Sequence, residues 1–201
     1  MTGPNPVFES TYTDYLSRIG EIDLHSIADC LGVRVRGGGV DIKMFDKVFH
    51  VSSRGIVDRQ GARPGFDVCV ILCRYLLMCP ARLSLGTDWV TYNGLRDSGP
   101  LTKFFQNEVE LPIATHFSGR VDELGVACRA LGGYSADIDG FYDLVLGFSA
   151  LPMIPVVLLF NDRDDDFPAS ASLLFQRRAE QYLDPECLAL LGWYLSGRLI
   201  D

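Results

Sequence analysis

Histidine, tryptophan and clustered basic residues are scarce in this chain of 201 residues, and the shortages exclude several classes of function. The three histidines, His25, His50 and His116, have no spacing typical of metal ligands, and none adjoins a nucleophile in the sequence. No G-x-S-x-G motif is present, which excludes a hydrolase of that kind. The glycines at 37–39 are not followed by Lys-Ser or Lys-Thr, so they predict a hairpin turn and not a phosphate-binding loop.

Positive charge is also in short supply. The chain has 18 basic and 26 acidic residues, a net charge of −8, and no stretch gathers lysine and arginine into a patch. Because phosphate contacts from basic side chains supply most of the affinity for nucleic acid, we expect no nucleic-acid partner. The acidic balance is typical of a soluble surface.

Long apolar runs are missing as well. The longest apolar segment, residues 66–78, is interrupted by Asp67 and Arg74 and is shorter than the ~20 residues of a spanning helix. Residues 1–8 lack the basic opening and apolar run of a signal peptide. We therefore expect a cytoplasmic protein with no membrane partner, in which the six cysteines are reduced thiols.

The hydropathy pattern predicts alternating helices and strands. The expected elements are a helix over 24–31, an antiparallel meander over 33–51, a helix over 65–79, a strand from Trp89 to Tyr92, a helix over 101–107, a helix capped by Ser118 that ends at Gly132-Gly133, strands over 141–148 and 156–160 with a bend framed by Pro152 and Pro155, a helix from Pro168 carrying Ala171, Leu174, Phe175, Ala179 and Tyr182, and a final helix from Asp184 to near Gly197.

These elements predict an α+β fold, a single domain over residues 1–201 with residues 1–10 as a loose arm. We expect a mostly antiparallel or mixed sheet covered by helices, with two helices at the C-terminus. The helix over 65–79 is apolar at nearly every position, which predicts a largely buried central helix.

Three cysteines of that region are candidate metal ligands. Cys69 and Cys73 are four residues apart and share a helical face, and Cys79 follows near the helix end. A soft metal or a cluster requires deprotonated thiols, and Arg74 is the nearest positive charge in the sequence. The competing interpretation is that these thiols are core packing, and on that interpretation no cofactor is expected.

An acidic run, Asp162 and then Asp164 to Asp166, offers carboxylate oxygens to a hard cation. The positions that a calcium loop requires to be glycine and glutamate hold Phe167 and Leu173, so that motif is absent. The alternative is a solvated turn in which Asp166 caps a helix that begins at Pro168.

Trp89, Tyr92 and Arg96 are the candidate ligand-binding residues. Arg96 follows two aromatic residues and an Asn-Gly turn, and loops of this composition often line pockets that bind anions. If the protein is an enzyme, Asp164 and Asp166 are the candidate bases, and Arg96 would orient a small anionic substrate. No catalytic residue follows from a motif.

The chain resembles a bacterial and archaeal family of domains of unknown function that is prevalent in anaerobes. The segments that carry the resemblance are 70–76, 89–96, 131–133, 151–156 and 166–169 followed by Leu174-Phe175. Some family members are joined to a four-cysteine iron–sulfur module, which this chain lacks. The resemblance implies an accessory role in anaerobic redox or corrinoid-linked one-carbon metabolism.

Three hypotheses of function follow. The first is a cytoplasmic accessory domain that binds a small molecule or a redox partner protein. The second is an enzyme that acts on a small anionic substrate through acidic residues and an arginine. The third is a metal or iron–sulfur carrier that uses its cysteines.

Overall fold

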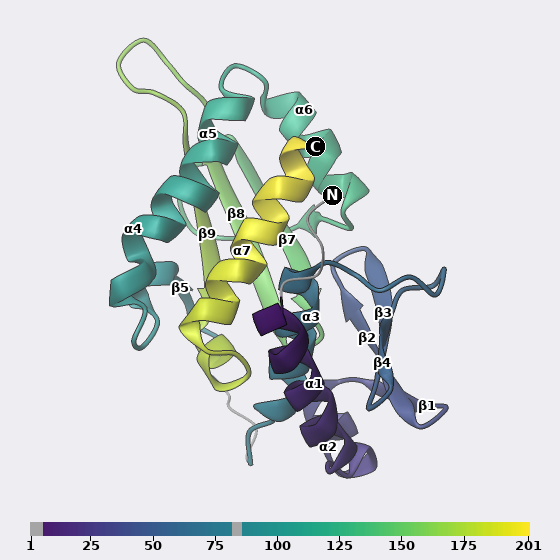
Figure 1. Cartoon of the computed structure of the whole chain (residues 1–201). Helices are drawn as coiled ribbons and strands as arrows, with labels where there is room; N and C mark the ends of the chain where they lie inside the picture. Colours follow the sequence, from purple (N-terminus) through teal and green to yellow (C-terminus); the bar gives the residue numbers. More distant parts are fainter. Residues whose placement is uncertain (1–5, 82–85) are drawn as a thin grey trace.

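Two antiparallel sheets organise the computed structural model, which describes residues 6–81 and 86–201 (Figure 1). The first has the order β1-β2-β3-β4, and the second has the order β5-β9-β8-β7-β6. The strands are β1 (Arg34–Arg36), β2 (Gly39–Met44), β3 (Lys47–Ser52), β4 (Gly55–Val57), β5 (Trp89–Thr91), β6 (Tyr134–Ser135), β7 (Leu144–Leu151), β8 (Ile154–Asn161) and β9 (Ser170–Gln176). The predicted α+β single domain is confirmed.

The first sheet is the predicted meander, and it projects to one side of the molecule (Figure 1). Gly37 and Gly38 form the two-residue turn between β1 and β2 with φ of 56° and 79°, values that glycine adopts without strain. Alternate residues of β2, such as Val40 and Ile42, are fully buried, whereas Asp41 and Lys43 face outward. One face of the meander therefore contributes to the core, and the other remains polar.

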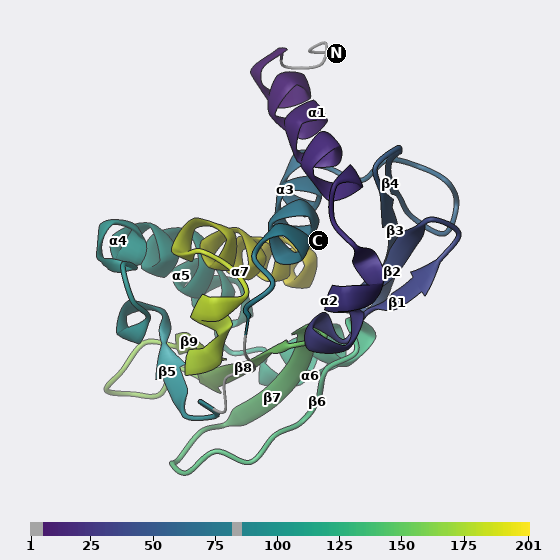
Figure 2. The same cartoon turned by 90° about the horizontal axis from the view of Figure 1, so that it is seen from below.

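The second sheet is apolar on both faces. In β8 the five residues 156–160 are all buried and apolar. Successive residues of a strand point to opposite faces, so both faces of β8 are apolar. The helix α5 (Leu111–Phe117) and the π-helical turn Gln106–Glu110 pack on β9, and α7 (Pro185–Ile200) packs against them (Figure 2). A smaller apolar cluster, which includes Trp89 and Ile138, covers the other face.

The predicted central helix is α3 (Phe66–Leu77). It lies between α1 (Pro6–Gly20), α7 and α2 (Leu24–Leu31), beside the meander (Figure 2). Seven of its twelve residues are buried, which confirms the prediction from its predominantly apolar sequence. The helix α6 (Val121–Ala130) and the short α4 (Thr102–Phe105) complete the domain. Within the described residues, no helix has the length and apolarity needed to cross a membrane.

The expectation of a helix starting at Pro168 is wrong. Residues 170–176 form β9, which pairs with β8 on one side and β5 on the other, and only residues 177–181 turn into a 3₁₀ helix before α7. Leu174 and Phe175 are both apolar because they lie on opposite faces of a sheet that is covered on both sides. Adjacent apolar residues of this kind also occur on the buried face of a helix, so the sequence pattern alone predicts a helix here. Of the two expected C-terminal helices, α7 is therefore present, and β9 with the 3₁₀ turn takes the place of the other.

Several boundaries also differ from the sequence prediction. The expected strand over 141–148 is β7, which begins at Leu144, and Pro155 lies within β8 opposite Ser149. Ser118 does not cap α6, because that helix starts at Val121 without a side-chain cap. The expected loose arm over residues 1–10 is helical from Pro6, the start of α1, and residues 1–5 lie outside the described residues.

Candidate functional site

The three predicted ligand-binding residues do not converge on one cavity. Trp89 belongs to the apolar cluster on the second sheet, and Tyr92 is buried with its ring stacked on Phe105 at 4.2 Å between centroids. The Tyr92 hydroxyl donates a hydrogen bond to the carbonyl oxygen of Pro185 at 2.8 Å. Arg96 is exposed, and its backbone N–H donates to the Glu180 carboxylate at 2.9 Å. These contacts give all three residues structural partners.

The acidic run lies at the other end of β9 from this corner. Trp89 pairs with Gln176, whereas Asn161, which precedes the acidic run, pairs with Ser170. Six residues of extended strand separate these two pairs, a distance of about 20 Å. Arg96 and the Asp164–Asp166 segment therefore do not form one site.

Asp164, and not Asp166, organises the acidic turn. The Asp164 carboxylate accepts hydrogen bonds from the backbone N–H groups of Asp166 and Phe167, at 2.8 and 2.7 Å. The expectation that Asp166 caps a helix is wrong, since no helix follows it. This geometry is that of a solvated turn closed by an aspartate side chain.

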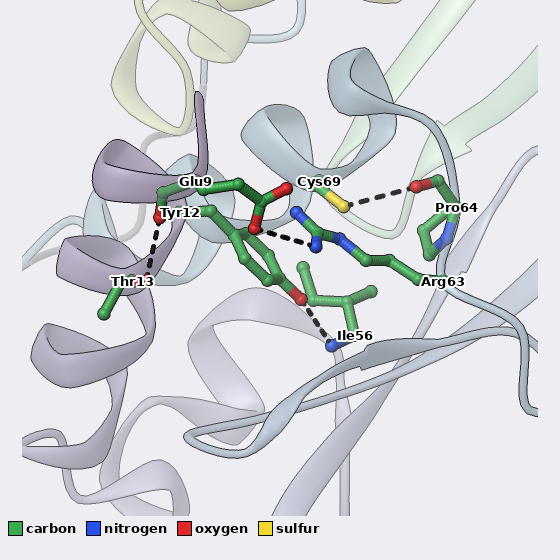
Figure 3. Close-up of polar contacts among 7 residues, drawn as sticks. All are labelled: Glu9, Tyr12, Thr13, Ile56, Arg63, Pro64 and Cys69. Carbon is green, nitrogen blue, oxygen red and sulfur yellow. Dashed lines mark hydrogen bonds and ion pairs between the residues drawn. The ribbon is translucent and has the colours of Figure 1, made fainter. Parts of the chain in front are cut away.

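The buried Cys69 lies where α1, α3 and the end of β4 meet (Figure 3). Its thiol donates to the carbonyl oxygen of Pro64 at 3.6 Å. Arg63 forms an ion pair with Glu9 at 3.1 Å and lies 4.0 Å from the centre of the Tyr12 ring. Burial raises the pKa of Cys69, although a hydrogen bond from Arg63 opposes the effect, so the group remains a thiol. The cluster fastens α1 to the rest of the domain.

The other two candidate metal ligands lie apart from that cluster. Cys73 is buried on α3, and burial raises its pKa to about 12. Cys79 follows the helix and donates to the Pro80 carbonyl oxygen at 3.8 Å. In residues 6–81 and 86–201, no group of three or more His, Cys, Asp or Glu side chains is placed to hold a metal ion. Burial keeps both thiols protonated, and that of Cys79 is bonded to a backbone carbonyl.

A groove on the outward face of the meander brings together charged side chains and a histidine, the residues best suited to bind a ligand. We call it the meander groove; its volume is about 470 Å³. It is lined by Arg36, Gly37, Asp41, Val48, His50, Val57, Asp58 and Arg59. Strands β1, β2 and β3 supply most of its polar side chains, so a rigid sheet fixes their positions.

At the centre of the meander groove, the carboxylate of Asp41 lies 2.8 Å from Nδ1 of His50. The two residues are directly opposite each other in the β2–β3 pair. The other carboxylate oxygen of Asp41 is 3.6 Å from the guanidinium of Arg36. With Nδ1 donating to Asp41, the neutral imidazole keeps Nε2 as a hydrogen-bond acceptor, and the protonated imidazole makes Nε2 a donor.

Gly39 makes room for this imidazole. A Cβ atom added at Gly39 would lie 2.8 Å from Nε2 of His50 and would clash with the carbonyl oxygen of Val51. Any larger residue would push the ring away or separate the strands. The third glycine of the 37–39 run therefore has a packing role that differs from the turn role of the first two.

The electrostatic character of this face differs from that of the whole protein. The meander groove and the adjoining hollow beside α2 are lined by four basic residues, Arg34, Arg36, Lys43 and Arg59, and three acidic ones, Asp29, Asp41 and Asp58. Asp41 is already paired, and Asp58 accepts two backbone N–H groups at 2.9 Å. Arg59 is exposed and forms no ion pair within the described part of the chain.

This arrangement can bind an anion and exchange a proton with it. Arg36 and Arg59 supply charge and forked hydrogen-bond donors, and His50 supplies a group whose Nδ1 is held by a carboxylate. The lining holds no serine, threonine or cysteine, so covalent catalysis by one of those nucleophiles has no candidate there.

The sequence interpretation missed His50 and Asp41, although a signal for the pair was present. Phe45 and Asp46 form the turn between β2 and β3, so Met44 lies opposite Lys47. Counting three residues back along β2 and three forward along β3 places Asp41 opposite His50. The sequence neighbours of His50 do not include Asp41. Cross-strand register, and not local spacing, reveals the pair.

The fold and the groove define a single-domain α+β protein in which one sheet presents a polar, partly basic face. The chain belongs to the DUF3786 family, described as a domain of unknown function, whose model matches residues 23–198. No curated protein and no solved structure matches the chain. The matched residues include all of the meander groove.

Proposed function

We propose that this domain binds a small anionic molecule, a phosphate or a carboxylate, in the meander groove. The observation that carries the proposal is the Asp41–His50 pair, at 2.8 Å, in a groove that also contains Arg36 and Arg59. Bidentate hydrogen bonds from arginine suit both carboxylate and phosphate groups. The proposal makes the protein a binding or accessory domain.

Burial and position support this choice over the Trp89–Arg96 corner. His50 and Asp41, with 29% and 21% of their side-chain surface exposed, line one groove together with Arg36 and Arg59, whereas Arg96 shares no cavity with Trp89 and Tyr92 in the part of the chain that the structure describes. The largest contribution to binding should come from Arg59, because binding a ligand there breaks no ion pair within the described residues.

A proton-transfer enzyme is a second candidate for the same groove. The carboxylate of Asp41 orients the imidazole of His50, an arrangement that general bases share. A 2-oxo acid that binds to Arg59 with the carbon next to its ketone near Nε2 would give a proton from that carbon to His50, leave the electron pair as an enolate, and regain a proton that has exchanged with solvent. Such exchange in D₂O, followed by proton NMR, should occur with wild type and stop in His50→Gln. Binding without exchange would contradict the enzyme hypothesis and support a role in binding only.

The wider biological setting rests on the family resemblance. We propose a cytoplasmic location, a setting in anaerobic redox or corrinoid-linked one-carbon metabolism, and either a small-molecule ligand or a redox partner protein, with no role in nucleic-acid binding. All six cysteines are free thiols, in keeping with a reducing compartment. A corrinoid should be included as a ligand in the assay below.

The test is a thermal-shift and calorimetric titration with inorganic phosphate, a dicarboxylate and a corrinoid. We expect phosphate or the dicarboxylate to raise the Tm of wild type, because a ligand that binds only the folded state stabilises it. Arg59→Gln should weaken binding at least about tenfold, as the loss of a charged hydrogen bond does.

The matched control is Arg18→Gln, since Arg18 is an exposed arginine on α1, away from the groove. It should bind as wild type does. Equal weakening in both variants would mean that only the net charge matters, and the proposal would then be wrong. The absence of any Tm shift with either anion would also contradict it.

A further inference from the structure

Two cysteines from different helices meet at one backbone carbonyl group. Cys30 lies in the last turn of α2, and Cys79 follows the end of α3. The Cys30 thiol donates to the Pro80 carbonyl oxygen at 3.4 Å, and the Cys79 thiol donates to the same oxygen at 3.8 Å. The two sulfur groups are also within hydrogen-bonding reach of each other.

These two are the only partly exposed cysteines of the six, since Cys69, Cys73, Cys128 and Cys187 are buried. A reagent in solution therefore reaches the Cys30–Cys79 pair more readily than any other thiol. The pair is separated by 49 positions in sequence, so the fold itself and not a local motif brings the thiols together.

We propose that Cys30 and Cys79 form a reversible intramolecular disulfide, which makes this pair a redox-sensitive site of the protein. The disulfide would connect α2 to the end of α3. The segment between the two cysteines contains the whole meander, so the closed loop would include the strands that carry the meander groove. The proposal does not depend on the anion-binding function.

The oxidant is a low-molecular-weight disulfide such as glutathione disulfide. The sulfur of one cysteine of the pair attacks one sulfur of the reagent, the reagent's S–S bond breaks, and one thiol leaves. The sulfur of the other cysteine then attacks the first in the mixed disulfide and releases the second thiol. Two electrons pass from the protein to the reagent, and the two cysteine protons leave with the two released thiols.

The two thiols share their environment. Burial, together with the hydrogen bond that it shares with Cys30, raises the pKa of Cys79. Because both thiols lie at one carbonyl oxygen, whichever forms the mixed disulfide has the other beside it to complete the bridge. The buried hydroxyl of Tyr182, which has no hydrogen-bond partner within the described residues, interacts electrostatically with both thiols and is an available donor to a thiolate.

The test is equilibration of the full chain in glutathione buffers of graded potential, followed by acid quenching, alkylation and mass mapping. We expect one monomeric product, two hydrogens lighter, with Cys30 linked to Cys79 and the other four cysteines alkylated. Its Tm should be about 10 °C higher than that of the reduced protein, because the bridge constrains the unfolded chain. Reducing agent should restore both free thiols.

Single variants distinguish the pair from general reactivity. Cys30→Ser and Cys79→Ser should stop at a mixed disulfide with glutathione or stay reduced, whereas Cys73→Ser, which removes a buried thiol, should form the same bridge as wild type. The proposal is overturned if wild type forms separate glutathione adducts on both cysteines, bridges a different pair, or stays reduced at every potential. Since the decisive result comes from wild type, poor folding of a variant would not obscure it.

Discussion

The two sheets of this protein use similar strands for different purposes. In the five-stranded sheet, β8 is buried on both faces, by the core on one side and by the small cluster around Trp89 on the other. In the meander, only one face is buried, and the other carries Asp41, His50 and several basic residues. The five-stranded sheet therefore contributes mainly to the hydrophobic core, whereas the meander has one solvent-accessible face on which a ligand can bind.

The difference also explains why the most apolar segments of the sequence do not contain the candidate site. The segments that dominate the sequence pattern, α3 and β8, are largely buried: seven of the twelve residues of α3 are buried, and so are residues 156–160 of β8. The meander groove is assembled from short strands with ordinary composition. Function is therefore expected on the less conspicuous sheet, where side chains can be polar without loss of core packing.

The largest effect should come from removing a large side chain from the five-stranded sheet. Phe160 is fully buried in β8, so Phe160→Ala should lower the free energy of unfolding by about 3–5 kcal/mol. Lys43→Ala, on the outward face of the meander, should change it by less than about 0.5 kcal/mol. Urea unfolding followed by circular dichroism measures both. Equal losses would contradict the assignment of different roles to the two sheets.

A substitution at Gly39 should have a smaller effect on stability and should also affect anion binding, because Gly39 packs against the imidazole of His50 in the meander groove. Gly39→Ala should lower the free energy of unfolding by about 1–3 kcal/mol, because the added Cβ meets the Val51 carbonyl and the His50 ring. It should also abolish anion binding, as measured by calorimetry. Gly197→Ala in α7 is the control: no atom lies within 4 Å of its added Cβ, so stability should be unchanged or higher.

The Arg74–Asp184 pair gives the helical part of the molecule a dependence on pH. Burial raises the pKa of Asp184, but hydrogen bonds from the Cys187 N–H and from Arg74 outweigh this effect, so its pKa lies below the ordinary value. A carboxyl with a lowered pKa stabilises the fold above its unfolded-state pKa of about 3.9, and this contribution is lost as the pH falls through the folded-state pKa.

Asp184→Asn should therefore reduce the free energy of unfolding at neutral pH by about 1 kcal/mol and flatten the acid side of its pH profile. Asn retains the ability to cap α7, which Asp184 does by accepting the Cys187 N–H at 2.8 Å, so the variant isolates the charge. Unfolding in urea at several pH values measures the effect. An unchanged slope between pH 5 and about 3 would show that another group is responsible.

The smallest effect on stability is expected at Arg59, a residue that we propose binds the anion. Arg59→Gln should change the free energy of unfolding by less than about 0.5 kcal/mol, because Arg59 is exposed and forms no ion pair in residues 6–81 and 86–201. The same substitution should weaken anion binding. Thermal melts with and without phosphate separate the two effects, and a large loss of stability without ligand would assign Arg59 a structural role instead.

Much of the fold could be predicted from the sequence, because most elements have a local signal. The helix α2 has Asp23 and Gly32 as its caps, α3 is apolar at most of its positions, and the glycines at 37–39 mark a hairpin turn. β9 could not be predicted in the same way. Its apolar pattern depends on the second small cluster, which only the folded sheet creates.

The candidate site was less predictable than the fold. Trp89, Tyr92 and Arg96 have the composition of a pocket, yet stacking on Phe105 and a contact with Glu180 occupy Tyr92 and Arg96. Asp41 and His50 are nine residues apart and have no motif. Their partnership depends on strand register, a long-range property that single-residue spacing does not encode.

The central claim is that the free face of the meander is the binding surface. The most direct measurement is a phosphate titration of the ¹⁵N-labelled full chain, with amide and imidazole resonances followed by NMR. We predict saturable shifts for His50 and for the amides of residues 36–59, with little change in β8. Shifts confined to the Tyr92–Arg96 corner or to Asp164–Asp166, or no saturable shift at all, would contradict the claim.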